Sequence, residues 1–191
     1  MILLRAEYLS HTMKVKIADL EFEPLIAADA IQTRIKEIAA QLNKDYADKA
    51  PVFVGVLNGC FMFMGDLLKE VTIPCEVAFT KLSSYHGGIS STRRIRDDFD
   101  LMTDIANRHV ILIEDIVDTG NTLDYLVAKL SHRKPASITV CALLLKPDAV
   151  EYAVEELKHV AFQIPNEFVV GYGLDYMEMG RNLNGIYKRV V

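Results

Sequence analysis

Two adjacent acidic residues, Glu114 and Asp115, follow a run of four branched apolar residues and precede a short polar loop, residues 118–122. The apolar run, residues 110–113, is typical of a buried strand, and residues 123–130 have the pattern of a helix. Free backbone amides at the start of such a helix attract an anion, and a glycine within the loop lets the backbone approach that anion closely. Carboxylates beside the anion could bind hydroxyl groups or a metal ion. The segment therefore predicts a site for a ligand that carries both a phosphate and a sugar.

Each part of this segment also has a simpler interpretation. Helix capping alone would explain Asp118, Thr119 and Thr122, because Asp and Thr are favoured at a helix N-terminus. The paired acids could be a solvated surface pair, although neighbouring carboxylates repel each other unless a positive or hydrogen-bonding group lies between them. The combination of adjacent acids with Gly120 favours phosphate binding over capping.

The composition limits the classes of protein to which the chain can belong. Its 191 residues are 51% hydrophobic and suffice for one core, so we expect a single domain over residues 1–191. A net charge of −5 gives no indication of a nucleic-acid partner. No apolar run reaches the ~20 residues that a membrane span needs, and Arg5 and Glu7 come too early for a signal peptide. We therefore expect a cytoplasmic protein, with residues 1–12 as a loose extension.

The three cysteines, Cys60, Cys75 and Cys141, have apolar neighbours in the sequence. An odd number without CxxC spacing argues against a disulfide framework and against a zinc site. We expect buried free thiols in a reducing cytosol.

Helical and strand patterns alternate along the chain, which predicts an α/β fold with a mainly parallel sheet covered on both faces. Beyond Pro147 the pattern breaks into short pieces, which suggests a separate small lobe. Residues 83–98 are polar, rich in Gly and Ser, and suit a mobile loop or lid. The expected helices are residues 24–46, 60–69 and 123–130, and the expected strands are residues 51–57, 75–82, 110–113 and 137–145.

The chemically suggestive residues follow the carboxyl ends of the expected strands. In an open α/β sheet, ligands bind at that edge. We therefore expect these residues to form one site. In strand order they are Leu57, Asn58 and Gly59; Ser84 and Tyr85; Glu114 and Asp115; and Lys146.

These motifs together resemble the type I purine phosphoribosyltransferases, and most closely the hypoxanthine and hypoxanthine-guanine enzymes. VILIEDIVDTGNT is similar to the family's motif for 5-phosphoribosyl 1-pyrophosphate, LNGCFMF to its pyrophosphate loop and SSY to the start of its lid. LLLKP and FVVGYGLDYMEMGR are similar to its base and metal segments. The sequence departs from some members at Asn121 and Asn58, where Lys also occurs. The resemblance implies a core over residues 25–146 and a hood from residues 1–24 and 147–191.

The implied reaction transfers 5-phosphoribosyl to hypoxanthine, with guanine as an open alternative, and gives IMP or GMP and pyrophosphate. The resemblance also implies Mg²⁺ as a cofactor and a homodimer or homotetramer. The preference among hypoxanthine, guanine and xanthine stays open. The implied catalytic residues are Asp118, Lys146 and Arg181, the implied metal ligands are Glu114, Asp115 and Asp175, and the implied substrate-binding set is Leu57, Asn58, Gly59, Ser84, Tyr85, Glu114, Asp115, Asp118, Thr119, Gly120, Asn121, Thr122, Lys146, Phe168, Val169, Asp175 and Arg181.

On the base side, the resemblance implies that Asp118 moves a proton at the purine imidazole. It also implies that Phe168 stacks on the base and that Val169 presents its backbone groups to the base edge. Lys146 could donate to a 6-oxo group and reject a 6-amino group. The alternatives are helix capping for Asp118, a core position for Phe168 and a solvated ammonium on an apolar stem for Lys146.

On the leaving-group side, the resemblance implies that Asp175 binds Mg²⁺ and that Arg181 clamps pyrophosphate. Each would otherwise be an ordinary surface charge. Leu57, Asn58 and Gly59 would bind pyrophosphate through backbone amides, with a Leu57–Asn58 peptide that could be cis.

Two other functions compete with this one. A non-catalytic regulator could use the same fold as a nucleotide sensor, but it should carry a basic nucleic-acid face, which the composition does not indicate. A phosphate-binding kinase of the P-loop type should carry a GxxxxGK[ST] loop, which the sequence lacks.

Overall fold

In the computed structural model of the chain, the described residues are 14–85 and 94–190. Their strands form two sheets, one of six strands and one of four. The strands are β1 (Val15–Ile17), β2 (Leu20–Ile26), β3 (Val52–Leu57), β4 (Glu76–Tyr85), β5 (Arg94–Phe99), β6 (His109–Val117), β7 (Ser137–Leu145), β8 (Leu157–Gln163), β9 (Val169–Val170) and β10 (Ile186–Arg189). The helices are α1 (Ala28–Asp45), α2 (Phe61–Glu70), α3 (Asn121–Ser131) and a short 3₁₀ helix, η1 (Pro147–Ala149).

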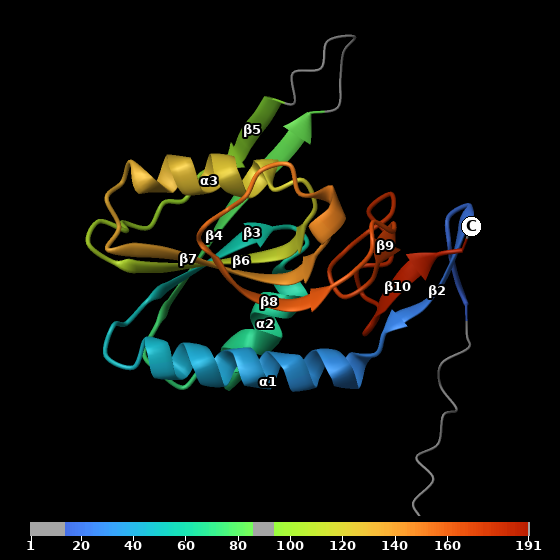
Figure 1. Ribbon diagram of the computed structural model, residues 1–191, viewed down its shortest axis with the longest axis horizontal. Coiled ribbons are helices and arrows are strands. Elements are labelled where there is room, and N and C mark those ends of the chain that lie inside the picture. The colour runs from blue at the N-terminus through green and yellow to red at the C-terminus, as the bar shows by residue number, and fades with distance from the viewer. Residues whose placement is uncertain (1–13, 86–93, 191) are drawn as a thin grey trace, which may run out of the picture.

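The six-stranded sheet has the order β5-β4-β3-β6-β7-β8. All neighbouring strands from β4 to β8 are parallel, and only β5 is antiparallel to its neighbour. The helices α1 and α2 cover one face of this sheet and α3 covers the other (Figure 1). The expected α/β class, with a mainly parallel sheet between helices, is confirmed.

The central strand β6 is buried on both of its faces, which is typical of a strand in a parallel sheet that helices cover on both sides. Residues 110–113 are fully buried, as expected for a strand with helices on both of its faces. Ile111 and Ile113 pack in the core beneath α1 and α2, whereas Val110 and Leu112 pack in the core beneath α3. The strand continues to Val117, so Glu114 and Asp115 lie within it and not after its end.

The first long helix begins later than the sequence pattern predicts. We expected it to start at Pro24, but residues 24–26 belong to β2 and pair with β10. The pairing shifts register between Ile186 and Tyr187, and such an irregularity accommodates a proline that has no N–H to donate. The helix α1 then buries one stripe of residues, Ile31, Ile35, Ile38, Ala39 and Leu42.

The prediction of a loop over residues 83–98 is wrong at both ends of that range. Residues 83–85 complete β4, and residues 94–99 form β5, which pairs antiparallel with β4. Polar residues are tolerated there because β5 is an edge strand. The central part of the expected lid, residues 86–93, lies outside the described residues.

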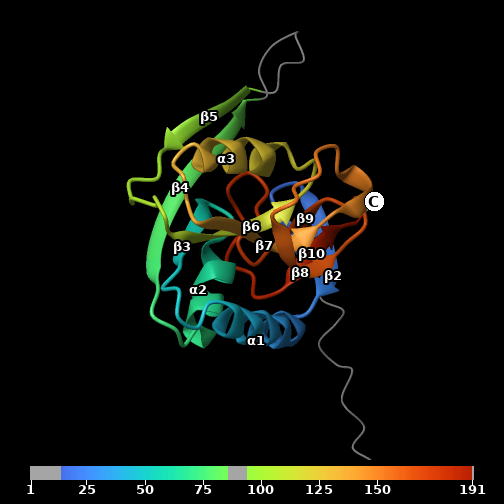
Figure 2. The same ribbon diagram turned by 60° about the vertical axis from the view of Figure 1, so that its left-hand side comes forward.

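The main sheet also extends past residue 146, where the family resemblance placed the end of the core. β8 joins it parallel to β7. Of the strands after residue 146, β9 and β10 enter the smaller sheet, whose order is β1-β2-β10-β9, so both ends of the chain contribute to that sheet. Figure 2 shows β5 at one edge of the main sheet, and Figure 1 shows the smaller sheet beyond the ends of the main strands. This arrangement agrees with the expected small hood from both chain ends.

The cysteines differ from each other in burial. Cys60 and Cys141 are buried, as expected, but Cys75 is exposed, because it lies in the connection just before β4. Among the described residues, no helix is long and apolar enough to cross a membrane.

Candidate active site

A cavity lies between the end of β6 and the start of α3. Its wall includes Glu114 from within the strand and the backbone of the loop that follows. The helix begins after Gly120, which is its N-cap residue and has a φ of 83°, a conformation that glycine adopts without strain. The first N–H groups of any helix lack partners within it, so these amides are available to an anion. The residues lining the cavity are Glu114, Ile116, Val117, Asp118, Thr119, Gly120, Thr122 and Leu123.

The loop is held from behind by a segment that the sequence pattern did not single out. The Thr119 carbonyl oxygen accepts hydrogen bonds from the backbone N–H groups of Glu151 and Tyr152, at 2.9 and 3.0 Å. A Cβ atom on Gly120 would lie 2.3 Å from the carbonyl oxygen of Tyr152. Residues 151–152 therefore fix the position of the loop. No local signal in the sequence indicates this contact.

Asp118 does not cap the helix. Its Oδ2 lies 3.2 Å from Lys146 Nζ, in an ion pair between the carboxyl ends of β6 and β7. Lys146 is only 7% exposed, and its backbone N–H donates to Val117. The alternative of a solvated Lys146 ammonium is therefore wrong, because the ammonium is buried beside Asp118.

A second cavity lies next to the first and shares Ile116 and Asp118 with it. Phe168 is 44% exposed at this cavity, with its ring centroid 5.7 Å from that of Tyr176 in an edge-on arrangement. The core alternative for Phe168 is therefore wrong, whereas its neighbour Val169 is buried in β9. The residues lining this second cavity are Asp115, Ile116, Asp118, Lys146, Phe168, Val169, Leu174 and Asp175.

Arg181 is held at the rim by several acceptors. Its Nη2 lies 2.7 Å from Asp175 and 2.8 Å from Glu178, and its Nη1 donates to the Gly173 carbonyl at 2.9 Å. Asp175 also accepts from the backbone N–H of Glu178, at 2.9 Å. The hydrogen bond from Arg181 holds the pKa of Glu178 below its usual value. The structure thus brings Asp175 and Arg181 together, and adds Glu178, which the sequence pattern did not indicate.

The turn after β3 contacts both Asp115 and the segment around Gly173 that holds Arg181. The Leu57–Asn58 peptide is cis. A Cβ on Gly59 would lie 1.5 Å from Asp115 Oδ2, and a Cβ on Gly173 would lie 1.9 Å from the Gly59 carbonyl oxygen. Only glycine fits at these two positions, so three separate segments meet in direct contact.

The paired acids are in an unfavourable environment for two charges. Burial first, and then the adjacent Asp115 carboxylate, raise the pKa of Glu114 well above its usual value. Burial also raises the pKa of Asp115, although its hydrogen bonds and the nearby Arg181 oppose the shift. Glu114 Oε2 is buried and has no hydrogen-bond partner among the described residues. The surface-pair alternative is therefore wrong, and this oxygen is available to a ligand.

Ser84 and Tyr85 lie at the end of β4, whose partner β3 ends at Leu57. The backbone of β4 thus runs toward the same edge of the sheet as the other predicted site residues.

Comparisons with known proteins place this geometry in context. Residues 25–177 match the phosphoribosyl transferase domain family. The chain is 44% identical over 170 residues to a hypoxanthine phosphoribosyltransferase of Haemophilus influenzae, covering 87% of this chain and 94% of that protein. It is 45% identical over 169 residues to a hypoxanthine-guanine phosphoribosyltransferase of Streptococcus pneumoniae, covering 87% and 93%.

Solved structures agree with these sequence matches. A crystal structure of a hypoxanthine phosphoribosyltransferase from Staphylococcus aureus superposes with a TM-score of 0.83 at 44% identity, covering 88% of this chain and 91% of that chain. The fold and the sequence therefore point to the same family.

Proposed function

Because this chain belongs to the hypoxanthine and hypoxanthine-guanine phosphoribosyltransferases, within the phosphoribosyl transferase domain family, we propose that it catalyses their reaction in purine salvage. The chain transfers 5-phosphoribosyl from 5-phosphoribosyl 1-pyrophosphate to hypoxanthine or guanine, giving IMP or GMP and pyrophosphate.

One observation carries the proposal. The two cavities share Ile116 and Asp118, and one is lined by a helix start while the other contains Lys146 and Phe168. A nucleoside monophosphate has the same layout, with a phosphate at one end, a flat base at the other and a sugar between them. The 5-phosphate would occupy the cradle formed by residues 118–122, and the ribose hydroxyls would lie against Glu114 and Asp115.

The base would occupy the second cavity. Lys146 donates a hydrogen bond to the 6-oxo group of the purine. A 6-amino group is itself a donor, so in its place it would face the Lys146 ammonium without an acceptor. Phe168 supplies a flat face for the ring, and Val169 presents its backbone to the base edge. The exposed face of Phe168 supports this assignment.

The reaction breaks the bond between ribose C1 and a pyrophosphate oxygen and forms a bond from C1 to a purine nitrogen. The proton lost from the purine imidazole goes to Asp118, which lines both cavities. Arg181 and the backbone of residues 57–59 receive the departing pyrophosphate, whose negative charge grows in the transition state. Ser84 and Tyr85 begin the segment that would close over the site and exclude water.

The acids fit a magnesium ion. Within the described residues no group of three or more His, Cys, Asp or Glu side chains lies close enough together to hold a metal ion by itself. Mg²⁺ commonly uses one or two carboxylates and completes its shell with substrate phosphates and water, and the unpartnered oxygen of Glu114 suits that role. Glu114 and Asp115 would hold Mg²⁺ on the ribose side, and Asp175 would hold it on the pyrophosphate side. A bound Mg²⁺ would neutralise charge on the pyrophosphate leaving group.

The assembly and location follow the same proposal. We expect one domain, active as a homodimer or homotetramer in the cytoplasm. The exposed apolar side chains Phe61, Val77 and Phe79, on α2 and β4, offer a surface for a second copy.

The test mixes the purified chain with 5-phosphoribosyl 1-pyrophosphate, MgCl₂ and each of hypoxanthine, guanine, xanthine and adenine. Separation of the products by chromatography should show IMP from hypoxanthine, and no AMP from adenine. Binding of IMP without formation of any nucleotide would overturn the enzyme proposal and favour a nucleotide sensor.

A further inference from the structure

Tyr172 has a backbone conformation that is unusual for a bulky residue. Its φ is 49°, and it lies between Gly171 and Gly173, with φ values of 98° and 103°. Glycine adopts this left-handed region freely, but an L residue with a large side chain does so at a cost of about 1–3 kcal/mol. The surrounding contacts must therefore hold Tyr172 in place.

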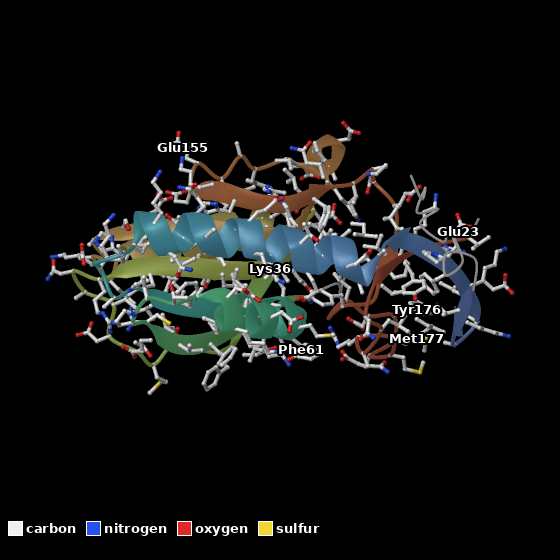
Figure 3. The ribbon with its side chains drawn as sticks, turned by 90° about the horizontal axis from the view of Figure 1, so that it is seen from below. Glu23, Lys36, Phe61, Glu155, Tyr176 and Met177 are labelled. Carbon is white, nitrogen blue, oxygen red and sulfur yellow. The ribbon has the colours of Figure 1, made fainter. Side chains whose placement is uncertain are left out.

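The side chain of Tyr172 supplies those contacts. The residue is only 2% exposed, and its hydroxyl donates to Asp66 Oδ2 at 2.6 Å. Gln32 Nε2 donates to the same carboxylate oxygen, at 2.6 Å, and lies 3.4 Å from the Tyr172 hydroxyl. Asp66 belongs to α2 and Gln32 to α1, and these helices lie side by side on this face of the sheet (Figure 3). One phenol thus joins the 171–173 segment to both helices.

The protonation states suit this arrangement. Burial and the hydrogen bond to Asp66 raise the pKa of Tyr172, so the phenol remains a donor at neutral pH. Burial opposes ionisation of Asp66, but hydrogen bonds from Lys69, Tyr172 and Gln32 outweigh it and lower the pKa of Asp66. A neutral donor therefore faces a charged acceptor, which makes the hydrogen bond stronger than one between neutral groups.

The backbone around Tyr172 leads directly to the rim of the site. The Tyr172 N–H donates to Leu183 and the Gly173 N–H donates to Arg181, at 2.8 and 2.9 Å. The Gly173 carbonyl in turn accepts from the Arg181 guanidinium, at 2.9 Å. Fixing Tyr172 therefore fixes the carbonyl that orients Arg181.

Asp66, which accepts the hydrogen bond from Tyr172, is connected through its helix to the opposite side of the same site. The helix α2, which contains Asp66, begins immediately after the turn at residues 57–60. Gly59 in that turn packs so closely on Gly173 that a Cβ on the latter would lie 1.9 Å from the Gly59 carbonyl oxygen. The Tyr172–Asp66 hydrogen bond thus spans the two segments that meet at this contact.

We infer that Tyr172 and Asp66 are positioning residues, whose hydrogen bond sets the spacing between the 57–59 turn and Arg181 so that both reach one pyrophosphate group. This inference rests on the proposed function. Neither side chain lines the two cavities of the candidate site, so neither is assigned a role in the chemical step.

The main test is Tyr172→Phe, which keeps the ring and removes the hydroxyl. Loss of one hydrogen bond to a charged group should weaken binding of magnesium pyrophosphate by about 10- to 100-fold if the whole effect reaches the site, measured by isothermal titration calorimetry. IMP carries no pyrophosphate, so its affinity should change much less. The KM for 5-phosphoribosyl 1-pyrophosphate should rise in parallel with the pyrophosphate dissociation constant.

Changes at Asp66 separate positioning from a general loss of packing. Asp66→Asn keeps an oxygen that can accept from both Tyr172 and Gln32, and its new amide nitrogen replaces the oxygen that faces the exposed Lys69, so most pyrophosphate affinity should be retained. Asp66→Ala removes the acceptor and should lose as much affinity as Tyr172→Phe. The double variant Tyr172→Phe with Asp66→Ala should be little worse than either single variant, because both remove the same bond. Lys69→Ala, which removes only the exposed ion pair of Asp66, is the matched control and should bind pyrophosphate normally.

The outcomes are distinct. Equal weakening of IMP and pyrophosphate in Tyr172→Phe, or unchanged pyrophosphate binding, would overturn the positioning role. If Tyr172→Phe does not fold, the comparison of Asp66→Asn with Asp66→Ala decides, and equal affinities in those two overturn the inference. A wild-type chain that binds pyrophosphate but forms no IMP overturns the proposed function alone, and one that binds neither ligand overturns both.

Discussion

Lys146 Nζ lies 3.2 Å from Asp118 Oδ2, and this ion pair joins the carboxyl ends of β6 and β7 at the second cavity. The lysine side chain is 9% exposed, whereas that of Asp118 is 51% exposed. The ammonium is therefore held in a fixed place, while the carboxylate remains open to a ligand. A cationic donor and an anionic acceptor thus face the same cavity, as a purine with an oxo group and a ring N–H requires.

We predict that Lys146→Met lowers kcat/KM for hypoxanthine by about 10- to 100-fold, because a charged hydrogen bond to the 6-oxo group contributes roughly 1.5–3 kcal/mol. Methionine keeps the apolar stem, so the fold should survive. Lys129→Met is the control, since Lys129 also forms an ion pair, with Asp100, away from both cavities. Full activity of Lys146→Met on hypoxanthine would contradict the assignment.

Asp118→Asn tests the proton-transfer role. The amide keeps the shape of the carboxylate but cannot accept a proton, so kcat should fall by about 100-fold or more. The KM for 5-phosphoribosyl 1-pyrophosphate should change little, because the proposed cradle would bind the 5-phosphate through backbone amides. Steady-state kinetics with each substrate varied in turn measures both quantities. Small and equal losses in kcat and in sugar-phosphate binding would speak against proton transfer.

The fold was predictable from the sequence where burial alone decides the pattern. The mostly apolar run at residues 137–145 coincides with β7, since a strand with helices on both faces needs apolar residues along its buried part. Pairings distant in sequence decided the remaining elements. Residues 24–26 form a strand because β10, from the other end of the chain, lies beside them. The polar residues 94–99 form a strand because β4 offers an edge.

In the candidate site, too, the positions that the strand pattern decides were predictable, and the contacts that turns and loops make were not. The meeting of Asp118 with Lys146 was predictable, because parallel strands end at one edge of a sheet. The backing of the loop by Tyr152, the contact of Glu178 with Arg181 and the burial of Tyr172 were not predicted. Each depends on a turn or loop whose position is set by the folded chain and not by a local pattern.

Glu114→Gln should stabilise the empty protein at neutral and higher pH. The folded-state pKa of Glu114 is raised above its unfolded value of 4.5, so the wild type loses stability as pH rises from that value toward the folded-state pKa. Gln carries no charge, and its amide can donate to Asp115. The gain in melting temperature of the variant should therefore be larger at pH 8 than at pH 5, at roughly 2–4 °C per kcal/mol.

Calorimetry without ligand or metal at both pH values measures this difference. The same variant should bind 5-phosphoribosyl 1-pyrophosphate more weakly, because it lacks the carboxylate that is proposed to bind the sugar or the metal. A melting temperature of the variant below that of the wild type at pH 8, or the same difference at both pH values, would contradict the claim that ionisation of Glu114 destabilises the folded protein.

Gly120→Ala should displace the phosphate cradle. Alanine at a φ of 83° is strained by about 1 kcal/mol or more, and its Cβ would lie 2.3 Å from the backbone oxygen of Tyr152, which cannot move without the 151–152 segment. We expect a lower melting temperature and a KM for 5-phosphoribosyl 1-pyrophosphate raised about 10-fold or more, if the lost cradle contacts contribute at least 1.4 kcal/mol. The matched control is Gly65→Ala in α2, where a new Cβ meets nothing within 4 Å. That variant should gain about 0.5–1 kcal/mol of stability and keep its activity, because alanine is the better helix former. Comparable kinetics in the two variants would show that the backbone at Gly120 does not hold the phosphate.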